Sequence, residues 1–349
     1  MPASKSVSEC GSAENNRSLV DLFSRTISYL RLSLTDRCNL KCLYCVPEEG
    51  GLPKLEQEDL LSYEELLRVV RAAVSLGMTK LRLTGGEPLV RRDLMRFVKQ
   101  LAEIKGLRDI RITTNGVLFE QYAEELRAAG ISKINISLDS LKPERFARIT
   151  GADCFAQVWR GIEKAQAVGF APVKLNMVVM RGVNDDELAD FAQLSRDTAL
   201  HVRFIEFMPI GESSRWHKDT YVPSDEIKAR LRDLGELIPV HRSETDGPAC
   251  MFRVGQEAKG KLGFISPLSH HFCDRCNRLR LTSEGMLRAC LLHDAETDLR
   301  SLLRHGGTDE EIRAALLAAV RSKPQGHRME ERLKAQEGGC HGRMSRIGG

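Results

Sequence analysis

The chain has 349 residues, of which 42% are hydrophobic and 29% are charged. This composition is typical of a folded globular protein with one large domain, or with a large and a small domain. The formal net charge of +4 is too small to indicate nucleic acid as a partner. No run of about 18 apolar residues indicates a membrane span, so we expect a cytoplasmic protein without a membrane partner.

The N-terminal segment predicts no targeting function. Residues 1–20 are rich in Ser and Asn, carry acidic residues and have no apolar stretch of the kind found in signal peptides. This composition favours a disordered leader.

The segment from residue 29 to about 207 alternates between two patterns. A short apolar or β-branched run is followed each time by a longer stretch with apolar residues three or four positions apart, often closed by Gly. Such alternation indicates a parallel sheet, and six units are fewer than the eight of a closed barrel. We predict an α/β fold with a partial (β/α)6 TIM-like barrel over residues 21–240; a flat doubly wound sheet is the alternative. The predicted strands are 29–36, 80–86, 109–116, 133–140, 173–180 and 202–208.

The pattern changes after about residue 240. Residues 250–269 predict a hairpin, and residues near 296–304 and 308–322 predict two helices. We expect residues 241–349 to form a C-terminal extension that carries a second cysteine group and ends in Gly-Gly.

Three cysteines follow the first predicted strand with the spacing C-x3-C-x2-C: Cys38, Cys42 and Cys45. A structural zinc site closes with four ligands, and no fourth cysteine or histidine lies near this group. Three thiolates on a four-iron cluster would leave one iron open for a substrate or cofactor. Because parallel α/β sheets place their sites at the carboxyl ends of strands, we expect the cysteines at that end.

This spacing resembles the signature of the radical S-adenosylmethionine family, and "TGGEP" at residues 84–88 resembles that family's glycine-rich segment. The resemblance implies a four-iron cluster that binds S-adenosylmethionine at its open iron and cleaves it to a 5′-deoxyadenosyl radical. It also implies the residues that contact S-adenosylmethionine. Tyr44 and Met208 would contact the adenine, Gly86 and Glu87 would bind the methionyl ammonium, and Ser137 would bind the carboxylate.

A second group has the spacing C-x2-C-x13-C: Cys273, Cys276 and Cys290. It also lacks a local fourth cysteine, and a structural zinc site remains the alternative here. Two arginines follow at Arg278 and Arg280. Guanidinium groups beside a metal cluster suggest an anionic substrate, because they bind phosphate oxygens bidentately.

Basic residues also occur on the predicted strands, at Arg31, Lys80, Arg82, Arg111 and Lys174. Such residues are depleted in ordinary cores, and a buried triphosphate would need paired cations. The alternative is that they extend to the rim of the barrel.

The second cysteine spacing, "TDRCN", "TGGEP" and the terminal "IGG" together resemble the GTP 3′,8-cyclase family of molybdenum cofactor biosynthesis, from about Phe23 to Gly349. The resemblance implies a second four-iron cluster whose open iron binds guanine, and a tail, Gly348 and Gly349, that enters the active site. It implies GTP contacts at Arg31, Arg82, Thr113, Lys174, Arg278, Leu279 and Arg280. This family often has "FGR" where residues 23–25 read "FSR".

The implied reaction is radical cyclisation of GTP to (8S)-3′,8-cyclo-7,8-dihydroguanosine 5′-triphosphate, the first step of molybdopterin biosynthesis. The expected cofactors are two 4Fe-4S clusters and S-adenosylmethionine. The expected partners are GTP, a flavodoxin- or ferredoxin-like one-electron reductant and, downstream, cyclic pyranopterin monophosphate synthase. The resemblance allows a homodimer without requiring one.

Two rival hypotheses remain open from the sequence. One is another radical enzyme with an auxiliary cluster, such as a peptide-modifying maturase. The other is an electron carrier or a zinc-stabilised binding module, which would have fully ligated metal sites.

Overall fold

The computed structural model describes residues 19–46, 54–211, 215–241, 247–335 and 338–348. Residues 1–18 of the predicted leader and the terminal Gly349 lie outside the described residues. Within these ranges, the helices lack the length and hydropathy needed to cross a bilayer.

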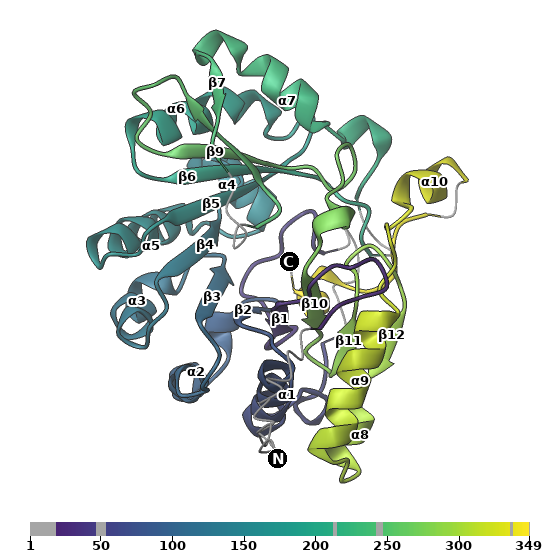
Figure 1. The fold of residues 1–349 in the computed structure, drawn as a ribbon. Helices are drawn as coiled ribbons and strands as arrows, with labels where there is room; N and C mark the ends of the chain where they lie inside the picture. The colour runs from purple at the N-terminus through teal and green to yellow at the C-terminus, as the bar shows by residue number, and fades with distance from the viewer. Residues whose placement is uncertain (1–18, 47–53, 212–214, 242–246, 336–337, 349) are drawn as a thin grey trace, which may run out of the picture.

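The six predicted strand–helix units are present, and each strand ends slightly before its predicted end (Figure 1). The residues between the observed and the predicted end of each strand belong to the loops that follow. The strands are β1 (Tyr29–Ser33), β2 (Lys80–Thr84), β3 (Asp109–Thr114), β4 (Lys133–Ser137), β5 (Val173–Val179) and β6 (His201–Glu206). The helices that follow them are α1 (Tyr63–Ser75), α2 (Leu94–Ala102), α3 (Phe119–Ala128), α4 (Pro143–Thr150), α5 (Phe155–Ala167), α6 (Leu188–Asp197) and α7 (Ser224–Arg230).

Local signals explain where these helices begin and end. Helix α1 begins with a capping box, in which Ser62 and Glu65 satisfy each other's backbone N–H groups. Helix α4 ends at Gly151, whose φ of 71° is the left-handed conformation that glycine adopts at low cost. The sequence pattern was therefore a good guide to this half of the chain.

The C-terminal part extends both edges of the same sheet. The strand order is β12-β11-β10-β1-β2-β3-β4-β5-β6-β9-β8-β7. Strand β10 pairs parallel to β1, and β9 pairs parallel to β6, so eight parallel strands lie side by side. The added strands are β7 (Leu237–Pro239), β8 (Cys250–Val254), β9 (Lys261–Ile265), β10 (Arg278–Leu281), β11 (Met286–Arg288) and β12 (Glu296–Asp298).

The predicted hairpin of residues 250–269 is confirmed as the antiparallel pair β8 and β9. The helix predicted at 296–304 begins only at Arg300, because Glu296–Asp298 pairs with β11 as an edge strand. The remaining helices are α8 (Arg300–Arg304), α9 (Asp309–Arg321), α10 (Met329–Lys334) and α11 (Met344–Ile347).

The sheet is curved, and its helices cover the outer face (Figure 1). Alternation along the strands separates two sets of side chains. Leu30, Leu81, Ile112 and Ile134 point to the helices and are at most 1% exposed. The alternate positions carry polar and charged side chains on the inner face, where the candidate site lies.

Ser24 adopts a strained backbone conformation at the entrance to the fold. Its φ of 60° lies in the left-handed region, inside a turn closed by the bond from the Asp21 N–H to the Arg25 carbonyl at 3.1 Å. This is the position where the resembled family often has glycine. A left-handed L-residue costs about 1–2 kcal/mol, part of which glycine would remove.

We therefore expect Ser24→Gly to raise the free energy of unfolding by up to about 1 kcal/mol, measured by chemical denaturation. Ser24→Ala is the matched control, because it keeps the strained Cβ and removes only the hydroxyl. Equal stability of the two variants would contradict the strain.

Candidate active site

The first cysteine triplet lies in the loop that leaves the carboxyl end of β1. Cys38, Cys42 and Cys45 are half-buried free thiols. The backbone N–H of Leu40 and the side-chain amide of Asn115 donate to the Cys38 sulfur at 3.4 and 3.6 Å. Burial raises the pKa of the Cys38 thiol, so that the thiolate needs a positive partner such as a metal.

Tyr44 anchors this loop to the end of β4. Its hydroxyl donates to Asp139 at 2.7 Å, and the other oxygen of Asp139 accepts the Val178 N–H at 2.9 Å. Asp139 is 2% exposed, and burial raises its pKa to about 6. The predicted adenine-contacting aromatic residue is thus held at a fixed point above the sheet.

The glycine-rich segment packs against the start of the cysteine loop. The Gly86 N–H donates to the Thr35 carbonyl at 2.7 Å, and the Glu87 N–H donates to the Arg37 carbonyl at 2.8 Å. A Cβ at Gly86 would overlap the Arg37 carbonyl. Glycine at this position therefore allows the close approach of two chain segments, in addition to any ligand.

Glu87, the expected acceptor for the methionyl ammonium, is held by donors of the protein itself. Its carboxylate is 1% exposed and accepts from the Thr114 hydroxyl at 2.7 Å, the Asn115 N–H at 2.6 Å and the Leu89 N–H at 3.0 Å. Burial raises its pKa to about 7. The side chain joins the ends of β2 and β3, and its oxygens are engaged by the protein itself.

The second triplet lies beside β10 and β11. Cys273 and Cys276 bracket a short 3-10 turn before β10, and Cys290 follows β11. The Arg278 guanidinium donates to the Cys276 sulfur at 3.5 Å. Burial would raise the pKa of Cys276, but Arg278 and Lys323 outweigh it and lower the pKa to about 6.

All three of these cysteines line a cavity of about 1210 Å³, a volume that includes its solvent-open part. Among the described residues, eight Lys or Arg side chains line it and no Asp or Glu does. We call it the basic cavity. Its cations are Arg31, Lys80, Arg82, Arg111, Lys174, Arg203, Arg278 and Arg280.

Four of these arginines form a row across adjacent strands. Arg280 on β10 is the register partner of Arg31 on β1, which pairs with Arg82 on β2, which pairs with Arg111 on β3. Like charges on directly paired residues are destabilising. The row therefore favours a bound polyanion that offsets the repulsion.

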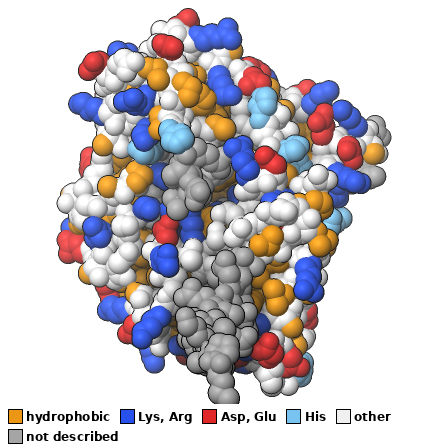
Figure 2. All heavy atoms as spheres, in the orientation of Figure 1, with side chains coloured by type: hydrophobic (Ala, Val, Ile, Leu, Met, Phe, Trp, Pro, Cys, Tyr) orange, Lys and Arg blue, Asp and Glu red, His pale blue; other side chains and the backbone are white. Residues whose placement is uncertain are grey.

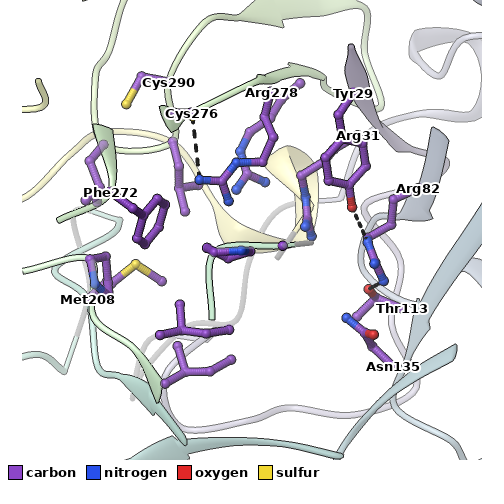
Figure 3. A pocket seen from close by; sticks show the side chains of 18 of the residues that line it. Tyr29, Arg31, Arg82, Thr113, Asn135, Met208, Phe272, Cys276, Arg278 and Cys290 are labelled. Atoms are coloured by element: carbon purple, nitrogen blue, oxygen red, sulfur yellow. Dashed lines mark hydrogen bonds between the residues drawn. The ribbon is translucent and has the colours of Figure 1, made fainter. Parts of the chain in front are cut away.

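The arginines of the row have defined partners. Arg82 donates to the Tyr29 hydroxyl and, at 3.1 Å, to the Thr113 hydroxyl (Figure 3). Arg111 is ion-paired with Asp109 at 2.5 Å, and Arg280 donates to the Gly348 carbonyl at 2.5 Å. These contacts fix the guanidinium planes before any ligand arrives.

Figure 3 shows how the cavity brings the two halves of the chain together. Tyr29, Arg31, Arg82, Thr113 and Asn135 come from the barrel strands. Arg278 of β10 lies beside Tyr29 and Arg31, and on the other side of the cavity are Phe272, Cys276 and Cys290 from the C-terminal part, with Met208 two residues after β6. By contrast, Figure 2 shows Lys and Arg interspersed with Asp and Glu over one outer face.

Some predicted site residues lie outside the wall of the cavity. Leu279 is fully buried in the hydrophobic core on the opposite face of β10, so only its backbone could meet a ligand. Ser137 lies half-buried at the end of β4, near the first triplet's loop. Gly348 is the tip of the described tail and lies against Thr84 and Gly85.

Sequence reasoning missed several cavity residues. Arg203 on β6 is 6% exposed, and its Nε and Nη2 atoms have no hydrogen-bond partner among the described residues. Burial, and then Arg82, lower its pKa to about 9. Tyr29 and Asn135 were missed too. The signal was available, since each is a polar or basic residue at an inward position of its strand, where apolar residues alternate with it.

The donor sets fit iron–sulfur clusters better than single ions. In the described part of the chain, no three His, Cys, Asp or Glu side chains are arranged to hold one metal ion. Zinc would need four donors at about 2.0–2.3 Å from one centre. A four-iron cluster takes one thiolate per iron, which suits two groups of three free cysteines.

Comparison with known proteins identifies the family. Residues 32–195 match the Radical SAM superfamily, and residues 200–329 match Molybdenum Cofactor Synthesis C. The GTP 3′,8-cyclase of Thermodesulfovibrio yellowstonii is 48% identical over 94% of this chain and 99% of its own length. The chain belongs to the GTP 3′,8-cyclase family. The cyclase of Moorella thermoacetica is 47% identical over the same shares of the two chains.

A solved structure supports the fold. Streptococcus suis SuiB bound to precursor peptide SuiA has a TM-score of 0.61 at 15% identity, over 86% of this chain and 65% of that chain. At this identity the likeness concerns the fold alone. The predicted α/β partial barrel of the cyclase family is confirmed.

Tyr29 offers a direct test of the cavity's electrostatics. Burial would raise its pKa, but Arg82 and Arg31 outweigh burial and lower it to about 7. We expect ultraviolet titration to show one tyrosinate forming near pH 7, among the 5 tyrosines of the chain. Because the folded state favours the ionised form, its contribution to stability is lost as pH falls through about 7.

Tyr29→Phe should remove this titration, and inorganic triphosphate should move its midpoint upward by offsetting the arginines. Tyrosinate that forms only near the ordinary value of about 10 would contradict the cationic environment.

Proposed function

We propose that this protein is a GTP 3′,8-cyclase, which converts GTP to (8S)-3′,8-cyclo-7,8-dihydroguanosine 5′-triphosphate at the start of molybdenum cofactor biosynthesis. The observation that carries the proposal is the arginine row beside three free cysteines. A nucleoside triphosphate has the anionic end that the row requires, and its base can reach the cysteine side of the same cavity.

The two cysteine triplets are proposed to hold two 4Fe-4S clusters. Cys38, Cys42 and Cys45 would hold the first, which binds S-adenosylmethionine. Cys273, Cys276 and Cys290 would hold the second, which binds GTP. When bound, the first cluster and S-adenosylmethionine supply the radical that starts the cyclisation.

Four residues are proposed to contact S-adenosylmethionine: Tyr44, Gly86, Ser137 and Met208. Their positions are compatible with a cofactor at the carboxyl ends of the strands. Tyr44 is oriented by Asp139, and Met208 borders the basic cavity. A cofactor held between them would lie next to the substrate.

The proposed GTP contacts are side chains of the basic cavity with the backbone of one core residue. Charged hydrogen bonds from guanidinium forks bind phosphate oxygens with defined geometry. Arg203 joins the set because its unpartnered guanidinium nitrogens face the cavity. The proposed contacts are Arg31, Arg82, Thr113, Lys174, Arg203, Arg278, Leu279 and Arg280.

The Gly-Gly tail is proposed to close the active site. The Gly348 carbonyl accepts from Arg280, and a Cβ at Gly348 would overlap the Thr84 hydroxyl. The tail therefore lies between the glycine-rich segment and the arginine row. The residues that line the active site would orient the ribose and guanine, and the tail would help to exclude water from the reacting atoms.

We also infer the surrounding steps of the pathway. A flavodoxin- or ferredoxin-like donor would supply single electrons, and cyclic pyranopterin monophosphate synthase would consume the product in the cytoplasm. The proposed reaction requires an electron source, because cleavage of S-adenosylmethionine to the radical takes up one electron.

The proposal is tested by anaerobic incubation of the reconstituted protein with GTP, S-adenosylmethionine and a low-potential reductant. We expect 5′-deoxyadenosine and the cyclised triphosphate, both measured by mass spectrometry. No 5′-deoxyadenosine above a GTP-free control would favour a different radical enzyme.

Iron content tests the cluster assignment separately. We expect about eight iron per chain in the wild type and about four in a Cys273/Cys276/Cys290→Ala variant. A wild type with zinc and no iron would contradict both assignments.

Arg203→Met should weaken GTP binding by about 10- to 100-fold, the effect of losing a charged hydrogen bond of about 1.5–3 kcal/mol. Equilibrium binding of GTP to the anaerobic protein measures the change. Arg127→Met, on the exposed outer face of α3, is the control. Unchanged affinity in Arg203→Met would remove this residue from the GTP site.

A further inference from the structure

Lys323 is a buried cation that touches both loops of the second cysteine site. It lies two residues after the end of α9 and is 3% exposed. Its ammonium group donates to the Arg278 carbonyl at 2.8 Å and to the Ala289 carbonyl. Arg278 lies two residues after Cys276, and Ala289 immediately precedes Cys290. One side chain therefore ties together the two loops that carry these cysteines.

The charge of Lys323 is balanced by the cysteine site itself. Both of its hydrogen-bond acceptors are neutral carbonyls, and among the described residues no Asp or Glu forms an ion pair with it. Burial lowers the pKa of Lys323, Arg278 and Arg25 lower it further, and only the ionised forms of Cys276 and Cys290 raise it. A buried ammonium without a counter-charge is costly. Negative charge on the two cysteines would supply that counter-charge.

Arg25 provides an instructive contrast. Its guanidinium also holds the cysteine region, because it donates to the Cys273 carbonyl at 2.6 Å. However, it forms a buried ion pair with Asp21 at 2.5 Å, so its charge is already compensated. Lys323, like Arg278, has no carboxylate partner among the described residues, so its charge is left for the cysteine site to balance.

The first triplet has the opposite surroundings. Its buried charged neighbours are the carboxyl groups of Asp139 and Glu87, at the ends of β4 and β2. A cation near an iron–sulfur cluster stabilises the extra electron of the reduced form, and a carboxylate opposes it. The two sites are therefore built with local charges of opposite sign.

From these contacts we propose that Lys323 is a positioning residue of the second cluster, which fixes the spacing of its cysteine loops and raises its reduction potential above that of the first. This inference rests on the proposed second cluster. Lys323 lies outside the cysteine motif, and its proposed role is to make the second cluster easier to reduce.

The test compares Lys323→Arg, Lys323→Gln and Lys323→Met in the reconstituted full-length protein. Arginine keeps the charge and the donors, glutamine keeps a donor without charge, and methionine removes both. Arg321→Met, an exposed position two residues away, is the matched control. Iron is counted in each chain. The midpoint potential of the second cluster is measured by electron paramagnetic resonance in a background where Cys38, Cys42 and Cys45 are Ala.

We expect Lys323→Arg and Arg321→Met to keep the wild-type potential, and Lys323→Gln and Lys323→Met to shift it to more negative values. Loss of iron from the second site alone in Lys323→Met would support the spacing role. Equal potentials and full iron in all variants would overturn the inference.

Two further outcomes are distinguishable. If Lys323→Met loses iron from both sites, it has not folded. The potentials of Lys323→Gln and Lys323→Arg then decide whether the charge of Lys323 raises the potential of the second cluster. If the wild type binds no second cluster, the proposed function itself fails.

Discussion

The arrangement of the site depends on one electrostatic constraint, the alignment of four arginines across adjacent strands. Leu30, Leu81 and Leu279 occupy paired positions one residue away from the arginines and are buried on the opposite face. A slip of one residue would exchange the two faces, so the hydrophobic core fixes the register of the cations. The core therefore stabilises a charge arrangement that is unfavourable without an anion.

Strand β1 connects the two cysteine sites. Its carboxyl end leads into the first triplet, and its parallel neighbour β10 begins two residues after Cys276. The pairing of β1 with β10 thus fixes where the two cysteine loops join the sheet. The surroundings differ even so: carboxyl groups lie near the first triplet, while Arg278 and Lys323 lie near the second.

The sequence predicted the barrel strands and both cysteine groups well, because these depend on local pattern and spacing. It did not predict that β9 and β10 would join opposite edges of the sheet, since such pairing depends on contacts between distant segments. Arg203 was missed although the alternation along β6 places it at an inward position, in the same way as the predicted cations of the other strands. Lys323 lies outside every motif, and its role depends on two carbonyl groups that only the fold brings together.

The strand order has a consequence for how the protein behaves at high concentration. The outermost strands, β7 and β12, have three residues each, and they contain Pro239 at one border and Glu296 and Asp298 at the other. A short border strand with proline or acidic side chains is a poor template for another chain. An exposed edge of such a wide sheet could pair with the edge of another molecule, and these short edge strands make that pairing unfavourable.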